Sequence, residues 1–114
     1  MWRDPAWVLD MLQAARKALE YAHDLTETQY LGSSRDQDAI IRQLTIVGEA
    51  AKRVSQEFKA KHSEIPWRKI AGFRDVVVHD YFHVDIKEVW RIVKGELPTL
   101  TKMLEPLLPP EEER

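Results

Sequence analysis

The feature that most restricts the fold of this sequence is a long apolar seam in its middle. The seam residues recur at steps of four, three, four, three and four: Ile40, Leu44, Val47, Ala51, Val54 and Phe58. This spacing places all of them on one face of an α-helix and suits near-parallel packing against other helices. The seam therefore predicts one long helix that forms part of a bundle.

A first helix is predicted before the seam, with Asp4 as its N-cap and Pro5 in its first turn. It runs to about Asp24 along one apolar stripe at helical spacing. The segment Thr26–Asp36 follows and contains Gly-Ser-Ser, which is typical of a loop. Two side chains in this loop are candidates for packing, Tyr30 and Leu31.

Two boundaries predict the helices after the seam. Because proline disfavours helical geometry in the residue before it and can itself open a helix, Ile65-Pro66 predicts a third helix, ending near Tyr81–Val84. Asp85 and Glu88 form a capping-box pattern that predicts the fourth helix, and Pro98 must kink or restart it. Its inward residues are expected to be Val89, Trp90, Val93, Leu97, Leu100, Leu104, Leu107 and Leu108.

The chain is predicted to be all-α, an antiparallel bundle of four main helices whose last helix is kinked or split. No segment alternates polar and apolar residues as strands do. Its 114 residues leave room for one domain, expected over residues 1–108, with an acidic tail over 109–114. The chain has no cysteine, which excludes disulfides, thiolate catalysis and cysteine-bound metal centres.

The net charge of -2 gives no overall attraction to nucleic acid, so any RNA contact requires a local basic patch. No apolar run approaches the ~20 residues of a membrane span, and the start of the chain lacks the apolar region of a signal peptide. We therefore expect a cytoplasmic protein without membrane contact.

A cluster of chemically active residues lies within eight positions: Arg74, Asp75, His79 and Tyr81, with three valines between Asp75 and His79. Arginine offers a permanent charge that matches phosphate oxygens, and histidine exchanges protons near neutral pH. This combination suits phosphodiester chemistry. On an ideal helix Arg74 and His79 lie about 140° apart, so a two-fold dimer would bring them to one phosphate more readily than a monomer.

With these helices in place, the chain resembles the HEPN family, specifically its HepT-like toxin subunits. The resemblance is carried by Gly48-Glu49-Ala50, Ile65-Pro66-Trp67, the segment Arg74–Tyr81, Trp90 and Leu97-Pro98. HEPN ribonucleases use an Arg and a His with four to six residues between them, which Arg74 and His79 match with four, and HepT-like members add a Tyr at the place of Tyr81. The residue after the Arg is often Asn in relatives and is Asp75 here.

The resemblance implies a homodimeric, metal-independent endoribonuclease without a cofactor, the toxin of a type II/VII-like toxin–antitoxin pair. Its partner would be a minimal nucleotidyltransferase antitoxin (MntA-like) that silences it by adenylylating Tyr81. From the residues, His79 would move the proton of the ribose 2'-OH or of the leaving 5'-oxygen, and Arg74 would stabilise phosphate charge. Asp75 could orient His79, and Glu49 is expected to form a structural ion pair with Arg74. This reaction predicts a 2',3'-cyclic phosphate product and an activity that EDTA does not change.

Other interpretations stay open at this point. The chain could be a non-catalytic helical subunit that binds and regulates a nucleotidyltransferase, or a plain interaction protein. His79 and His83 are four apart and could ligate zinc, but they lack a third committed ligand, so no metal site is predicted. The tryptophans are interpreted as core or dimer-interface anchors rather than base-stacking platforms: Trp2, Trp7, Trp67 and Trp90.

Overall fold

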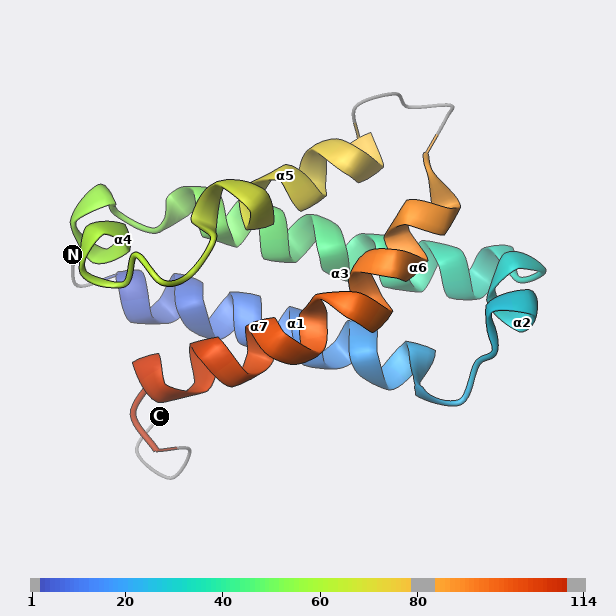
Figure 1. Cartoon of the computed structure of the whole chain (residues 1–114), viewed down its shortest axis with the longest axis horizontal. Coiled ribbons are helices and arrows are strands. Elements are labelled where there is room, and N and C mark those ends of the chain that lie inside the picture. The colour runs from blue at the N-terminus through green and yellow to red at the C-terminus, as the bar shows by residue number, and fades with distance from the viewer. Residues whose placement is uncertain (1–2, 79–83, 111–114) are drawn as a thin grey trace.

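The computed structural model describes residues 3–78 and 84–110, and every regular element in these residues is helical (Figure 1). The all-α prediction is confirmed. Three long helices, α1 (Asp4–His23), α3 (Ser34–Arg53) and α5 (Trp67–Val78), run antiparallel to their neighbours. The middle helix, α3, packs against α1 on one side and against α5 on the other.

The fourth predicted helix is split into α6 (Ile86–Gly95) and α7 (Leu97–Leu104), followed by the 3-10 turn η1 (Glu105–Leu107). The break falls just before Pro98, as predicted, since proline fits the first turn of a new helix. Helix α6 contacts α1, α3 and α5, whereas α7 lies along α1 (Figure 1). None of the described helices is both long enough and apolar enough to cross a bilayer.

The apolar seam is buried as predicted, but it belongs to two helices. Its residues from Ile40 to Val54 are at most 2% exposed. Helix α3 ends at Arg53, Val54 adopts an extended backbone, and Phe58 lies on the short helix α4 (Gln56–Lys61). Ser55 causes the interruption because its hydroxyl accepts a hydrogen bond from the Phe58 N–H (3.1 Å) and caps α4. The prediction of one continuous helix is therefore wrong.

The predicted loop also contains a helix, α2 (Glu27–Leu31), which a reciprocal capping box between Thr26 and Gln29 starts. Tyr30 on this helix is fully buried, as expected, whereas Leu31 is 39% exposed. The Tyr30 hydroxyl donates to the carbonyl of Ile86 (2.8 Å), and its ring stacks on Trp90. Burial, with the charge of Asp85, raises the pKa of Tyr30 to about 12, so the phenol stays a donor at neutral pH.

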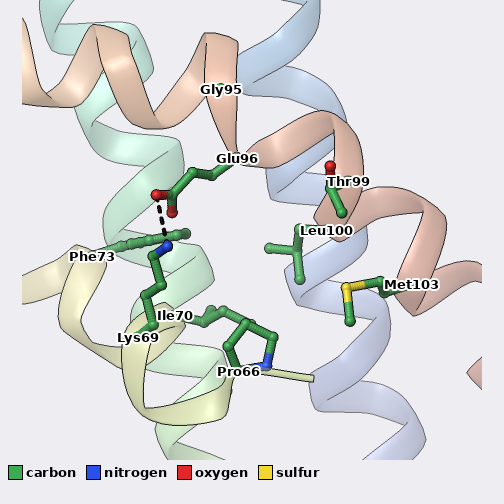
Figure 2. A pocket seen from close by; sticks show the side chains of 9 residues that line it. All are labelled: Pro66, Lys69, Ile70, Phe73, Gly95, Glu96, Thr99, Leu100 and Met103. Atoms are coloured by element: carbon green, nitrogen blue, oxygen red, sulfur yellow. Dashed lines mark ion pairs between the residues drawn. The ribbon is translucent and has the colours of Figure 1, made fainter. Parts of the chain in front are cut away.

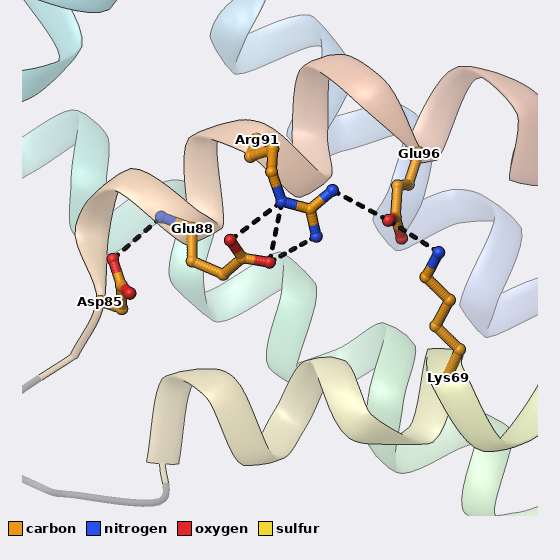
Figure 3. Close-up of polar contacts among 5 residues, drawn as sticks. All are labelled: Lys69, Asp85, Glu88, Arg91 and Glu96. Atoms are coloured by element: carbon orange, nitrogen blue, oxygen red, sulfur yellow. Dashed lines mark hydrogen bonds and ion pairs between the residues drawn. The ribbon is translucent and has the colours of Figure 1, made fainter.

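At the start of α6 the Asp85 carboxylate accepts from the Glu88 N–H (3.0 Å), which confirms the predicted N-cap (Figure 3). The Glu88 carboxylate itself binds the Arg91 guanidinium (Figure 3). The expected inward residues Val89, Trp90 and Val93 are buried. The predicted end of the third helix runs through residues 79–83, outside the described residues.

The prediction that Asp4 is the N-cap of the first helix is wrong. Arg3 takes that position, and Asp4 lies in the first turn with only 1% of its surface exposed. Its carboxylate accepts hydrogen bonds from the Ser55 N–H (2.8 Å) and hydroxyl (2.6 Å), which ties the start of α1 to the start of α4. Burial raises the pKa of Asp4, but hydrogen bonds from the charged N-terminus and from Ser55, together with the charge of the N-terminus, outweigh it and lower the pKa to about 2.

The lowered pKa of Asp4 predicts a loss of stability in acid. The pKa of Asp4 is lower in the folded chain than in the unfolded chain, so its contribution is present above pH 4 and lost as the pH falls toward 2. The contribution is about 2 kcal/mol. Urea unfolding of wild type between pH 7 and pH 2 should show this loss, and Asp4→Asn should be less stable at pH 7 with a shallower pH dependence. The exposed Asp24→Asn is the control, and an identical pH profile for Asp4→Asn and wild type would contradict the assignment.

Candidate active site at the α3–α5 junction

A close approach between α3 and α5 places Arg74 of α5 directly against Gly48 of α3. A Cβ built on Gly48 would lie 2.8 Å from both the backbone nitrogen and the Cβ of Arg74, and 3.2 Å from its Cα. Real Cβ atoms essentially never come this close to backbone, so the two helices meet here only because residue 48 has no side chain. This contact fixes where the Arg74 side chain leaves the surface of α5.

A chain of charged side chains surrounds that point. The Arg74 Nε donates to Glu49 Oε1 (3.3 Å), and its Nη1 lies 4.0 Å from Asp75 Oδ1. Lys52 of α3 approaches the same Asp75 oxygen (3.6 Å). Two carboxylates and two cations therefore alternate across the junction of α3 and α5.

These groups are oriented but remain open to solvent. The Arg74 side chain is 39% exposed, and that of Glu49 is 50% exposed. An ion pair at such exposure contributes only ~0–1 kcal/mol. An incoming phosphate can therefore replace Glu49 as the partner of the guanidinium. The Arg74 side chain would keep its direction, because the packing of α5 against Gly48 on α3 sets it.

The structure brings three of the predicted site residues together: Arg74, Asp75 and Glu49. The expected ion pair between Arg74 and Glu49 is present. His79 and Tyr81 lie outside the described residues, as does His83 of the alternative zinc pair. Lys52 was not predicted, although its spacing of three from Glu49 puts both on one face of α3. No group of three metal-ligating side chains occurs within residues 3–78 and 84–110.

A second charged cluster lies across α5, α6 and α7 (Figure 3). Glu96, at the break between α6 and α7, pairs with Lys69 (2.9 Å) and with Arg91 (3.1 Å). Arg91 also binds Glu88, and this hydrogen bond lowers the pKa of Glu88. The cluster holds the helix break against α5.

Beside this cluster, a pocket of about 230 Å³ opens between α5 and α7 (Figure 2). Its walls are mainly apolar, among them Ile70, Phe73, Leu100 and Met103. The Lys69–Glu96 pair lies at one side of the pocket (Figure 2). Among the described residues its lining includes no histidine, and its one cation, Lys69, pairs with a carboxylate that is only 16% exposed. Because Arg74 pairs with a more exposed carboxylate and precedes His79 by five residues in the sequence, the α3–α5 junction is the better candidate for phosphate chemistry.

Comparison with known proteins identifies the family of the chain. The family described as Ribonuclease HepT-like matches residues 11–107. A protein of Thermococcus cleftensis named "Probable ribonuclease HepT" is 38% identical over 86% of this chain and 89% of its own length. A protein of Methanocaldococcus jannaschii named "Putative RNase" is 31% identical over 88% of this chain and 92% of its own. No solved structure matches the chain significantly.

The close contact at Gly48 predicts opposite effects for two glycine substitutions. Gly48→Ala should destabilise the fold by roughly 1 kcal/mol or more, because overpacking against the Arg74 backbone costs ~1–3 kcal/mol and exceeds the ~1 kcal/mol gained in helix propensity. Gly72→Ala in α5 is the matched control, since its new Cβ meets nothing within 4 Å, and it should stabilise by up to ~1 kcal/mol. Urea denaturation measures both, and equal stability of the two variants would refute the tight contact.

Proposed function

This chain belongs to the HepT-like family of ribonucleases, and from that premise we propose that it is a metal-independent endoribonuclease whose site is built from Arg74 and His79. The observation that carries the proposal is the position of Arg74. Its guanidinium is anchored by the glycine contact, directed by one exposed carboxylate and half open to solvent. A fixed cation on the surface can stabilise the charge of a phosphate, and a histidine that can transfer protons follows it five residues later in the sequence.

In the proposed reaction the 2'-oxygen of the ribose attacks the adjacent phosphorus, and the 5'-oxygen of the next nucleotide leaves. One His79 imidazole takes the 2'-OH proton, and a second His79 gives a proton to the leaving oxygen. Arg74 exchanges Glu49 for the phosphate oxygens and stabilises their growing charge. The products are a 2',3'-cyclic phosphate and a 5'-hydroxyl, and no metal takes part. Asp75 assists by orienting His79.

The second imidazole would come from a second copy of the chain. On one helix Arg74 and His79 are separated by about 140°, which does not bring both to a single phosphate. A two-fold dimer with the junction at its interface supplies the missing side chain from the facing copy. The proposed active form is thus a homodimer.

The proposal includes control by a partner. The protein acts as the toxin of a toxin–antitoxin pair, and a minimal nucleotidyltransferase antitoxin transfers AMP to the Tyr81 hydroxyl, releasing pyrophosphate from ATP. The added nucleotide carries a negative phosphate two residues from His79 and would occupy the place of the RNA backbone.

Cleavage of a mixed RNA in EDTA tests the enzyme. Wild type should cut it and leave 2',3'-cyclic phosphate ends, whereas His79→Ala should lose ~10²–10⁴ in rate because its general acid–base group is gone. His23→Ala, which changes an exposed histidine far along the sequence, is the control and should keep full activity.

The same assay, run as a dilution series, tests the dimer. Activity per chain that stays constant below the dimer dissociation constant would exclude a composite site. No cleavage by unmodified wild type would favour the regulatory-subunit interpretation, in which Arg74, His79 and Tyr81 contact the nucleotidyltransferase instead of cutting RNA.

The modification site predicts a variant that escapes silencing. Tyr81→Phe keeps the ring but lacks the hydroxyl that accepts AMP, so it should remain toxic and unlabelled when the partner and labelled ATP are supplied. Tyr21→Phe, an exposed tyrosine on α1, is the control and should be labelled and silenced like wild type. Equal labelling of Tyr81→Phe and wild type would place the modification elsewhere.

A further inference from the structure

A polar groove runs between α1 and α3, next to the candidate active site. It consists of two adjoining hollows of about 290 Å³ and about 190 Å³, which share Asp10 and Ile46. Glu49, the partner of Arg74, lines the larger hollow. Gln43 and Lys17 line the smaller one. A ligand in the groove would therefore extend from the place where Arg74 would hold a phosphate.

Gln43 is the unusual residue of this groove. It interrupts the buried face of α3 and is only 6% exposed, yet its amide forms no hydrogen bond within the described residues. In that same part of the chain no fully enclosed side-chain nitrogen or oxygen lacks a partner, so the Gln43 amide must reach the solvent of the groove. A mostly buried amide without a protein hydrogen bond contributes less to stability than one that has such a bond. The Gln43 amide also offers a donor and an acceptor side by side to a ligand in the groove.

The larger hollow provides a stacking surface. The Arg53 guanidinium lies over the Trp7 ring, with its central carbon 5.1 Å from the ring centroid. Trp7 is only partly buried, unlike Trp67 and Trp90, which are each 8% exposed. Unpaired bases stack on aromatic rings and on arginine planes in single-stranded RNA complexes. Trp7 packs against the core, as expected from the sequence, and its partly exposed ring also lines the larger hollow, where a base could contact it.

We propose that this groove binds an unpaired base of the RNA substrate, and that it prefers bases with an exocyclic amino group. The inference rests on the proposed ribonuclease function and names the substrate element next to the cut phosphate. The Gln43 amide can pair with a base edge through one donor and one acceptor, as glutamine does with adenine. The Asp10 and Glu49 carboxylates only accept hydrogen bonds, so they favour adenine, cytosine or guanine over uracil.

The size and charge of the groove support a base over a protein partner. The volume of each hollow is near or below about 300 Å³, the lower limit of typical small-ligand pockets. Each is therefore too small for a protein segment of several side chains. Cations lie at both ends, Lys17 in the smaller hollow and Arg53 in the larger one. They are placed to meet the phosphates on either side of a bound base.

Binding of 2'-O-methyl RNA decamers tests the groove without cleavage, because these strands lack the attacking hydroxyl. We expect wild type to bind an adenine decamer at least ~10-fold more tightly than a uracil decamer, as measured by fluorescence anisotropy. Gln43→Leu, of similar volume, should abolish this preference. It should also keep or raise the melting temperature, because it replaces a side chain that is only 6% exposed and has no hydrogen bond within the described residues with an apolar one of similar volume. Gln56→Leu, at an exposed position, is the control and should keep the preference.

Three results would overturn the proposal: an unchanged base preference in Gln43→Leu, a lower melting temperature, or an altered oligomeric state. A lower melting temperature would show that Gln43 has a structural role. An altered oligomeric state would show that a second copy of the chain covers the groove. The base preference and the RNA cleavage are read out separately. Cleavage without a preference would refute only the groove, whereas a preference without cleavage would refute only the catalytic proposal.

Discussion

The structure depends on the contact between the Gly48 backbone and the Arg74 backbone. Because α3 lies between α1 and α5, this single close approach determines how α5 sits on the rest of the bundle. It also determines where the Arg74 side chain leaves α5. The carboxylate that pairs with this side chain belongs to Glu49, the residue after Gly48 on α3. Gly48 thus both allows the close packing of α3 against α5 and positions Arg74, the candidate catalytic cation.

Polar groups at helix ends hold the remaining elements in place. Asp4 reaches across to Ser55, and Ser55 in turn caps α4. Tyr30 of α2 donates to the first residue of α6 and stacks on Trp90. Both contacts join residues more than fifty positions apart in the sequence. The Tyr30 contacts place the start of α6 on the core, and the Asp4–Ser55 contact places the start of α4 against α1.

The apolar spacing predicted the long helices because burial dictates that spacing directly. It could not show that the seam breaks at Val54, since the break comes from Ser55 capping a new helix while it holds Asp4 of another. Asp4 was misassigned for the same reason: an acidic residue before proline resembles an N-cap, and only the fold supplies its distant partner. For the site, the Glu49–Arg74 ion pair was predicted, whereas the Gly48–Arg74 contact, Lys52 and the unpaired Gln43 amide became visible only when α1, α3 and α5 were assembled.

The charges around the junction suggest how a chain of net charge -2 could act on RNA selectively. Lys52, Arg53 and Arg74 gather there, but Asp75 and Glu49 accompany them, so the local field is nearly balanced. A balanced field gives little non-specific attraction to the RNA backbone. Affinity must then come from exchanging weak surface ion pairs for phosphate contacts, from base contacts in the groove, and from a second copy of the site. Each of these depends on geometry, so the enzyme would gain selectivity from the same arrangement that limits its general affinity for nucleic acid.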